Sequence, residues 1–295
     1  ATQGRRPHQR PARVRQSGLI KNPRFSGLFW TQFIGAFTDN LFKTALTLLV
    51  IFGNWSVGGL SPEHLTYLAG ALFIGPFFIC SATAGQLADK MEKSMLIRRL
   101  KLAEIFFSLL ALGGLFTGNV VILLVVLLFF ALQAAFFGPI KYGILPELLD
   151  ETELVAGNAL VETATNMAIL LGTIVAGEMV HRLPAPVVGV VLIVISILGY
   201  LASTRIPYVP SKAPNLSVEW NPIVPTWRMM VLLNEQRAIF NSVLGISWFW
   251  LLGGAIIAFF PVYTKDVLYS NAEVETLLLS VFSIGVGVVS MWCEK

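Results

Sequence analysis

A charged pair lies within one of the most apolar stretches of the sequence. Asp39 and Lys43 stand four residues apart in FTDNLFKTAL, residues 37–46, with Asn40 and Thr44 beside them. Residues at this spacing share one helical face, where an acid and a base can pair. A charge inside an apolar helix is costly unless it meets a partner or a polar cavity. We therefore predict that Asp39, Asn40 and Lys43 line a binding site, in which Asp39 would bind an amine of the ligand, a coupling cation or only Lys43.

A second polar strip occurs later in the chain. Asn158, Glu162 and Asn166 recur every four residues, so a helix would place them on one face. Glu162 is a candidate for a ligand ammonium or for a contact that closes a gate. Lys141 would bind a phosphate as a point charge or anchor its helix at a membrane surface. We predict that Gln133, Lys141, Glu162 and Asn166 contribute to the same binding site as the first strip.

Several other residues have more than one interpretation. Glu104 follows a run of basic residues and is expected in a charge network at a membrane surface. Trp248 and Trp250 would line a path for an apolar group or serve as packing residues. Gly172 and Gly177 belong to two small-xxx-small pairs, which favour close packing of helices.

Sequence patterns of known catalytic sites are missing from the chain. It has no zinc-binding His-Glu-x-x-His, no phosphate-binding loop and no nucleophile elbow. Cys80 and Cys293 lie in apolar stretches without paired spacing, so they predict neither a disulfide nor a metal site. We expect no metal, no cofactor and no covalent chemistry from this chain.

The composition is that of a membrane protein. Of the residues, 55% are hydrophobic and 13% are charged, with a mean hydropathy of +0.72, whereas soluble domains carry about 25% charged residues. A helix that crosses a bilayer needs about 20 mostly apolar residues. Eight stretches qualify: 28–52, 66–88, 95–117, 119–140, 157–180, 186–203, 239–263 and 275–293.

The distribution of positive charge predicts the orientation of these spans. The net charge of +4 and pI near 9.1 do not indicate nucleic-acid binding, because the charges gather in alternate loops. If the N-terminus is cytoplasmic, nearly all of the 21 lysine and arginine residues lie on that side, as the positive-inside rule requires. The cytoplasmic set includes Lys101 and Lys141, and only Arg182 and Lys265 lie outside, with Lys43 inside a span.

Loop composition divides the chain into four parts. Residues 1–24 are rich in Arg and Pro and are expected to form a disordered basic tail. Residues 25–203 would form a six-helix bundle, and the proline-rich segment 204–238 a cytoplasmic linker. Residues 239–295 would be the first two helices of a second bundle. We interpret the chain as a fragment of a longer protein.

The loop between the second and third spans carries a recognisable motif. GQLADKMEKS, residues 85–94, resembles the loop signature of the major facilitator superfamily. In this motif Gly85 would admit a neighbouring helix, Asp89 would accept hydrogen bonds or pair with a base, and Lys90 and Lys93 would hold the loop in the cytoplasm. The resemblance implies a gating role and two helical bundles facing a central cavity. The expected fold is an all-α membrane protein, a major facilitator bundle truncated to about eight transmembrane helices.

Three longer segments narrow the resemblance. Residues 37–46, FFGPIKYGILPELL (136–149) and GNALVETATNMAILLGT (157–173) are similar to bacterial lysophospholipid transporters. WNPIVPTW (220–227) and GISWFWLLGG (245–254) resemble the branch fused to acyltransferase and acyl carrier protein synthetase modules. The resemblance implies transport of lysophospholipids, chiefly lysophosphatidylethanolamine, across the bacterial inner membrane for re-acylation. Its expected partners are this substrate, membrane lipids and the fused modules.

Two other functions are compatible with the same residues. The loop signature also occurs in carriers of small solutes or drugs. A membrane platform that docks the acyltransferase modules without moving anything is the third possibility. A membrane enzyme has the least support, because the chain lacks catalytic patterns.

Overall fold

The computed structural model describes residues 16–53 and 55–292, and these are almost entirely helical. Within that part of the chain the only extended pairing is an isolated bridge between Val57 and Leu60. The helices are α1 (Gln16–Lys21), α2 (Pro23–Phe52), α3 (Pro62–Lys90), α4 (Lys93–Thr117), α5 (Val120–Leu148), α6 (Leu154–Arg182), α7 (Ala185–Ser203), α8 (Ile223–Asn234), α9 (Arg237–Asp266) and α10 (Ala272–Trp292).

Polar residues at the loop boundaries explain where several helices begin. The Asn22 side chain accepts a hydrogen bond from the Arg24 amide, and Pro23 opens α2. Ser61 and Pro62 repeat this arrangement at the start of α3, and Asn119 caps α5. These side chains satisfy amide groups that lack a partner in the first helical turn, so each turn between spans can be short.

The expected spans correspond closely to helices. Seven of the described helices, α2 to α7 and α9, are long and apolar enough to cross a membrane. α10 coincides with the eighth expected span, although it is not among those seven. The all-α membrane fold predicted from hydropathy is therefore confirmed. The fourth span is longer than expected, because α5 continues through Pro139 and Pro146 to Leu148.

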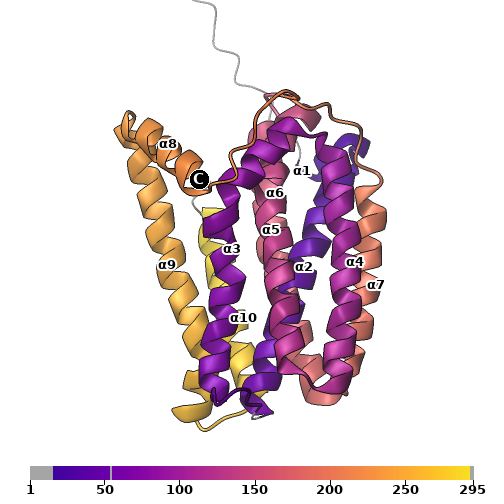
Figure 1. The fold of residues 1–295 in the computed structure, drawn as a ribbon, viewed down its shortest axis with the longest axis vertical. Helices are drawn as coiled ribbons and strands as arrows, with labels where there is room; N and C mark the ends of the chain where they lie inside the picture. The colour runs from indigo at the N-terminus through magenta and orange to yellow at the C-terminus, as the bar shows by residue number, and fades with distance from the viewer. Residues whose placement is uncertain (1–15, 54, 293–295) are drawn as a thin grey trace, which may run out of the picture.

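Helices α2 to α7 pack as one bundle (Figure 1). α2 lies against α6 and α7, α3 lies against α5, and α4 lies against both α5 and α7. The α2 and α6 backbones are close enough that a Cβ at Gly172 would lie 2.7 Å from the Phe37 carbonyl oxygen. The predicted small-residue packing therefore occurs at Gly172, and it fixes the two helices that carry the polar strips.

The two C-terminal helices pack on this bundle mainly through α10 and α6. Glu63 at the start of α3 pairs with Lys265 at the end of α9, at 3.3 Å. His181 at the end of α6 lies 3.0 Å from Glu273 at the start of α10. Both contacts lie at the end of the molecule away from α8 and the preceding segment, which Figure 1 shows at the top.

The segment between α7 and α9 is attached to the first bundle along part of its length. We call residues 205–219 the strap. The side chains of Ile206 and Val209 are buried among α1, α2, α4 and α5. Arg98 donates a hydrogen bond to the Ile206 carbonyl at 2.9 Å, and Lys212 pairs with Glu147 at 2.8 Å. The strap is followed by α8, so this segment is more ordered than its proline content suggests.

The prediction that residues 1–24 form a disordered tail is wrong for the last of these residues. Residues 16–21 form α1, and Pro23 already begins α2. Leu19 is buried against the strap and the first turns of α2, which provides apolar contacts that hold α1 in place. Residues 1–15 lie outside the described residues.

Candidate functional site

A fully buried ion pair lies at the centre of the first bundle. The Lys101 ammonium of α4 is 2.5 Å from Glu104 Oε2, and the two side chains are 1% and 0% exposed. Gln133 of α5 donates a hydrogen bond to the same Glu104 oxygen at 3.1 Å. The expectations of a cytoplasmic Lys101 and a surface Glu104 are therefore wrong, because both side chains point between α2, α5 and α7.

Asp39 lies beside this pair and is 9% exposed. Its Oδ1 atom is buried and has no hydrogen-bond partner. Asp39 interacts electrostatically with Glu104, Lys101 and Lys43, yet no ion pair links it to any of them within the described part of the chain. A buried carboxylate oxygen without a partner is costly, so this atom is available to a cationic ligand group.

Lys43 does not form the predicted pair with Asp39. Its ammonium lies over the Phe73 ring of α3, 5.0 Å from the centroid. Glu275 of α10, which is buried, interacts electrostatically with Lys43 ahead of Asp39. The spacing of four residues allowed a pair within α2, but a carboxylate from the second bundle competes for this lysine.

Asp39 and its charged neighbours form a group of three carboxylates and two ammonium groups. Glu104 holds Lys101 directly, and Glu275 faces Lys43. Asp39 is the carboxylate left without a cation of its own in this group of five residues. Asn40, the next residue, is also buried, but its amide donates to the Ala36 carbonyl at 2.8 Å within α2.

The second polar strip forms a separate group, nearer to the strap. The Lys141 ammonium is 3.5 Å from the Thr165 hydroxyl and lies over the Tyr142 ring, 4.6 Å from its centroid. Thr165 donates to the Gln32 side chain of α2 at 2.9 Å. Lys141 lies within α5 and is largely buried, so it does not sit beyond the end of its helix as the sequence suggested.

Glu162 and Asn166 share a face of α6 with this group. The Tyr142 hydroxyl donates to Glu162, whose carboxylate is exposed and interacts electrostatically with Lys141. Asn166 donates to the Glu162 carbonyl at 3.1 Å. Glu162 is thus exposed at the strap end of α6, whereas α10 packs on the other end of this helix.

A small cavity separates the two bundles next to Asn166. Its volume is about 60 Å³, and it is lined by Asn166, Ile169, Phe249, Trp250, Gly253, Ile257 and Phe282. Trp250 therefore faces this space, and Trp248 is not among the residues that line it. The lining is apolar and aromatic apart from Asn166, so the cavity suits a hydrocarbon group beside one polar group.

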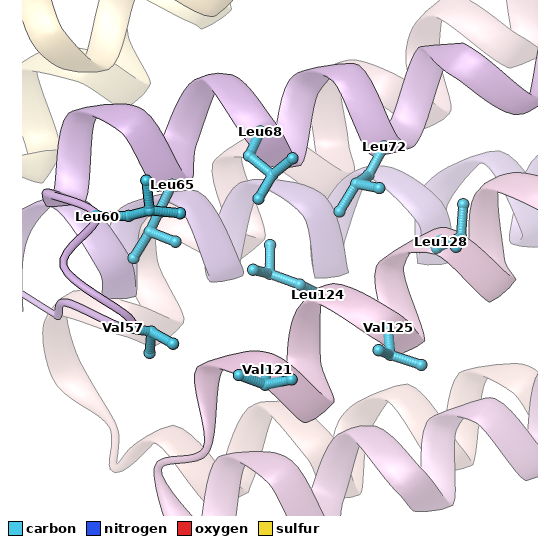
Figure 2. Close-up of a pocket in the computed structure, with 9 residues that line it drawn as sticks. All are labelled: Val57, Leu60, Leu65, Leu68, Leu72, Val121, Leu124, Val125 and Leu128. Atoms are coloured by element: carbon cyan, nitrogen blue, oxygen red, sulfur yellow. The ribbon is translucent and has the colours of Figure 1, made fainter.

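A larger pocket of about 320 Å³ lies between α3 and α5 (Figure 2). Figure 2 shows leucine and valine side chains from both helices and from the preceding turn around an open space. Its lining is wholly apolar: Val57, Leu60, Leu65, Leu68, Leu72, Val121, Leu124, Val125 and Leu128. Its lining offers no partner for a charged group.

The loop motif is arranged differently from the expectation. The space beside Gly85 is open, because no atom lies within 4 Å of a Cβ built there. Asp89 is exposed, and its carbonyl accepts a hydrogen bond from the Ala213 amide of the strap at 2.9 Å. Lys90 is half-buried, whereas Lys93 is fully buried with an ammonium that has no hydrogen-bond partner. The segment in contact with this loop is therefore the strap, and not the neighbouring helix that the motif predicted.

Glu92 connects the motif to the strap. Its carboxylate caps α4 by accepting from the Ser94 and Met95 amides, and it accepts from the Val209 amide of the strap at 3.2 Å. Burial opposes ionisation, but the hydrogen bonds from Ser94, Val209 and Met95 hold the pKa of Glu92 below its usual value. Glu92 is therefore a structural anion for both segments.

Sequence reasoning missed three contributors to the site: Lys101, Gln32 and Glu275. Lys101 and Glu104 are three residues apart on one helix, a spacing at which side chains meet, and this signal was available. Gln32 and Glu275 reach the site only because α2 meets α6 and α10 meets the first bundle.

Curated relatives cover most of the chain. It is 30% identical to the lysophospholipid transporter LplT of Serratia proteamaculans over 270 residues, which covers 88% of this chain and 62% of that protein. The corresponding protein of Enterobacter is 28% identical over 86% of this chain and 62% of its own length. That of Yersinia enterocolitica is 28% identical over 92% of this chain and 65% of its own length. The chain thus spans somewhat less than two thirds of these relatives.

One solved structure and one family model also match the chain. A crystal structure of a peptide transporter POT in complex with sulfate aligns with 86% of this chain and 57% of its own, with 17% identity and a TM-score of 0.46. Residues 28–294 match the family described as Major Facilitator Superfamily, which includes all the described spans and both polar groups. This multi-pass membrane protein belongs to the Major Facilitator Superfamily.

Proposed function

We propose that the chain forms the N-terminal part of a transporter that moves lysophospholipids, of the lysophosphatidylethanolamine type, by alternating access. The observation that carries this proposal is the unpartnered Oδ1 of Asp39, a buried carboxylate without a cation of its own. A primary ammonium would satisfy both its charge and its hydrogen-bonding capacity. The names of the curated relatives support the substrate class.

The remaining parts of such a lipid have matching surroundings. Lys141, in the second polar group, is a candidate for the phosphate. Its ammonium is 3.5 Å from the Thr165 hydroxyl, lies over the Tyr142 ring and interacts electrostatically with the exposed Glu162, without a direct ion pair among the described residues. Part of the acyl chain would enter the small apolar cavity between α6, α9 and α10, beside Trp250 and Phe282. Gln133 would act indirectly through Glu104, whereas Asn166 would lie at the boundary between head group and chain.

Rocking of the two bundles would move the lipid between leaflets. The first bundle is joined to α9 and α10 at the end of α6 and the start of α3, whereas Glu162 is exposed at the opposite end of α6. We place the strap end in the cytoplasm, with the N-terminus, in the bacterial inner membrane. Gly85, Asp89, Lys90 and Lys93 would then regulate the cytoplasmic opening.

The product of transport would be re-acylated. Acyltransferase and acyl carrier protein synthetase modules, where a longer parent carries them, would act on the lipid after it reaches the cytoplasmic leaflet. The described part of this chain has no group of three or more His, Cys, Asp or Glu residues suited to a metal. We propose that the transporter part moves the lipid without covalent chemistry.

Leaflet-resolved transport tests this proposal. Full-length parent protein is reconstituted in liposomes with fluorescent lysophosphatidylethanolamine, alongside Asp39→Asn and the exposed control Glu151→Gln. We expect movement by the parent and the control, and none by Asp39→Asn. Movement by all three would remove Asp39 from the mechanism but keep the substrate. No movement by any of them, in liposomes where an unrelated flippase is active, would overturn the proposal.

A further inference from the structure

Lys101 reaches the centre of the bundle through a gap left by two glycines. A Cβ built at Gly35 of α2 would lie 2.3 Å from the Lys101 ammonium. A Cβ at Gly199 of α7 would lie 3.7 Å from Lys101 Cδ. The ammonium also lies 5.4 Å from the centroid of the Phe137 ring of α5. The side chain is therefore confined on three sides, and its charged end lies against α2.

Asp39 is one helical turn beyond Gly35, on the same face of α2. The Lys101 ammonium consequently lies near two carboxylates, Asp39 and Glu104, which both interact with it electrostatically. It is in hydrogen-bonding contact with only one of them, Glu104, at 2.5 Å. Two anions thus compete for one cation in a largely buried region.

Gln133 fixes the outcome of this competition. Its amide donates to Glu104 Oε2, the same oxygen that receives Lys101, at 3.1 Å. The other oxygen, Oε1, is buried and has no partner. Gln133 of α5 therefore holds Glu104 in an orientation in which Lys101 contacts Glu104 and not Asp39.

We propose that Glu104, oriented by Gln133, is a positioning residue that withholds Lys101 from Asp39 and so keeps the Asp39 carboxylate free for the substrate ammonium. This inference rests on the proposed function. Lys101 is needed in turn to neutralise Glu104, since an unpaired carboxylate at this depth would be strongly disfavoured. Removing Lys101 and Glu104 together should therefore be tolerated, whereas removing only one of them should not.

The charge balance distinguishes this role from a general structural one. In Glu104→Gln, Lys101 loses its partner and turns to Asp39, so the substrate ammonium must compete with a lysine. In the double variant Lys101→Met with Glu104→Gln, both charges are gone and Asp39 is free again. A purely structural pair would also make the single variant less stable than the double one, but it would impair transport of lipids with and without an ammonium alike. The discriminating readout is therefore a KM change confined to the lipid that carries an ammonium.

The experiment measures KM and kcat for two lysolipids in liposomes containing the full-length parent. Lysophosphatidylethanolamine carries an ammonium, and lysophosphatidylglycerol does not. For Glu104→Gln we expect KM for the first lipid to rise about tenfold, equivalent to about 1.4 kcal/mol, with little change for the second. The double variant should recover to within about threefold of the parent. Gln133→Met, which keeps every charge, should raise KM in the same direction but by less.

The inference would be overturned by an unchanged KM in Glu104→Gln, or by an equal rise in KM for both lipids. It would also be overturned if KM did not recover in a monodisperse double variant. If Glu104→Gln fails to fold, an unchanged KM in Gln133→Met would overturn it. In each case transport by the parent would leave the proposed function intact. A parent that moves neither lipid would overturn the proposed function, and with it this inference.

Discussion

Thr276 of α10 packs directly on Gly177 of α6. A Cβ at Gly177 would lie 2.2 Å from the Thr276 hydroxyl oxygen and 3.0 Å from its Cβ, too close for any side chain. This contact joins the two bundles at the end away from the strap, next to the His181 and Glu273 pair. The glycine is therefore required by the crossing of the helices, which is why the small-residue pattern of α6 extends this far.

Replacing this glycine should separate α6 from α10. We expect Gly177→Ala to lower the free energy of unfolding by about 1–3 kcal/mol, the usual cost of overpacking. Gly75→Ala in α3 is the matched control, because nothing lies within 4 Å of a Cβ there, and it should be neutral or slightly stabilising. Thermal unfolding of the purified proteins in detergent measures both. Equal melting temperatures for the two variants would contradict the prediction.

The Glu63 and Lys265 pair can be examined by exchanging its charges. Each single reversal, Glu63→Lys or Lys265→Glu, should weaken the contact of α3 with α9, and the double reversal should restore it. The pair is about one third exposed, with an N–O distance of 3.3 Å, so we expect a coupling energy below about 1 kcal/mol. Melting temperatures at low and high salt supply the measurement, and the coupling should fade as salt rises. Additive single effects would show that the pair contributes nothing.

Glu92 should make attachment of the strap depend on pH. Because the pKa of Glu92 is lower in the folded state than its usual value, the carboxylate stabilises the protein above its unfolded pKa of about 4.3. This stabilisation is lost as the pH falls through the lower, folded pKa. Glu92→Gln should cost about 1 kcal/mol at pH 7, as the loss of a cap does, and less below pH ~4.

Cysteine labelling can follow the strap in that variant. A cysteine in place of Val209, which is buried, should react faster with a water-soluble maleimide in Glu92→Gln than in the parent at pH 7. The parent should approach the rate of the variant as the pH falls. Identical rates at pH 7 would mean that the Val209 contact does not hold the strap.

Removing the charge of Lys93 should stabilise the protein. Its ammonium is completely buried and lacks a hydrogen-bond partner. Its electrostatic interaction is with Glu147, a partly exposed carboxylate that already pairs with Lys212, so most of the cost of burying this charge is uncompensated. We expect Lys93→Met to raise the melting temperature, whereas Lys90→Met, at a half-buried position, should change it little. A lower melting temperature for Lys93→Met would show that the ammonium has a stabilising partner.

Hydropathy was sufficient to predict the spans but not the depth of every charge. Lys101 follows Arg98 and Arg99 in the sequence, so it was assigned with them to the cytoplasmic side of the membrane. Its actual position depends on Gly35 and Gly199, which belong to distant helices and leave room for it. A sequence pattern within one helix cannot report such a gap.

The sequence pointed to buried polar residues but not to their partners. Asp39 and Gln133 are buried and Asn166 lines the cavity between the bundles, whereas Glu162 is exposed. The expected partner of Asp39 was Lys43, because four residues separate them. Glu104 and Glu275 compete for the two lysines from other helices, and such long-range competition follows only from the packing of α4 and α10.

The strap also determines where the molecule can bend. Its amides at Val209, Ala213 and Glu219 donate to Glu92, Asp89 and Gln86 of the first bundle. Any swing of α9 relative to α2 must therefore be absorbed by the few residues on either side of α8, chiefly 220–222 and 235–236. More than thirty residues connect α7 to α9. Only the short stretches on either side of α8 are left to act as hinges, because the strap moves together with the first bundle.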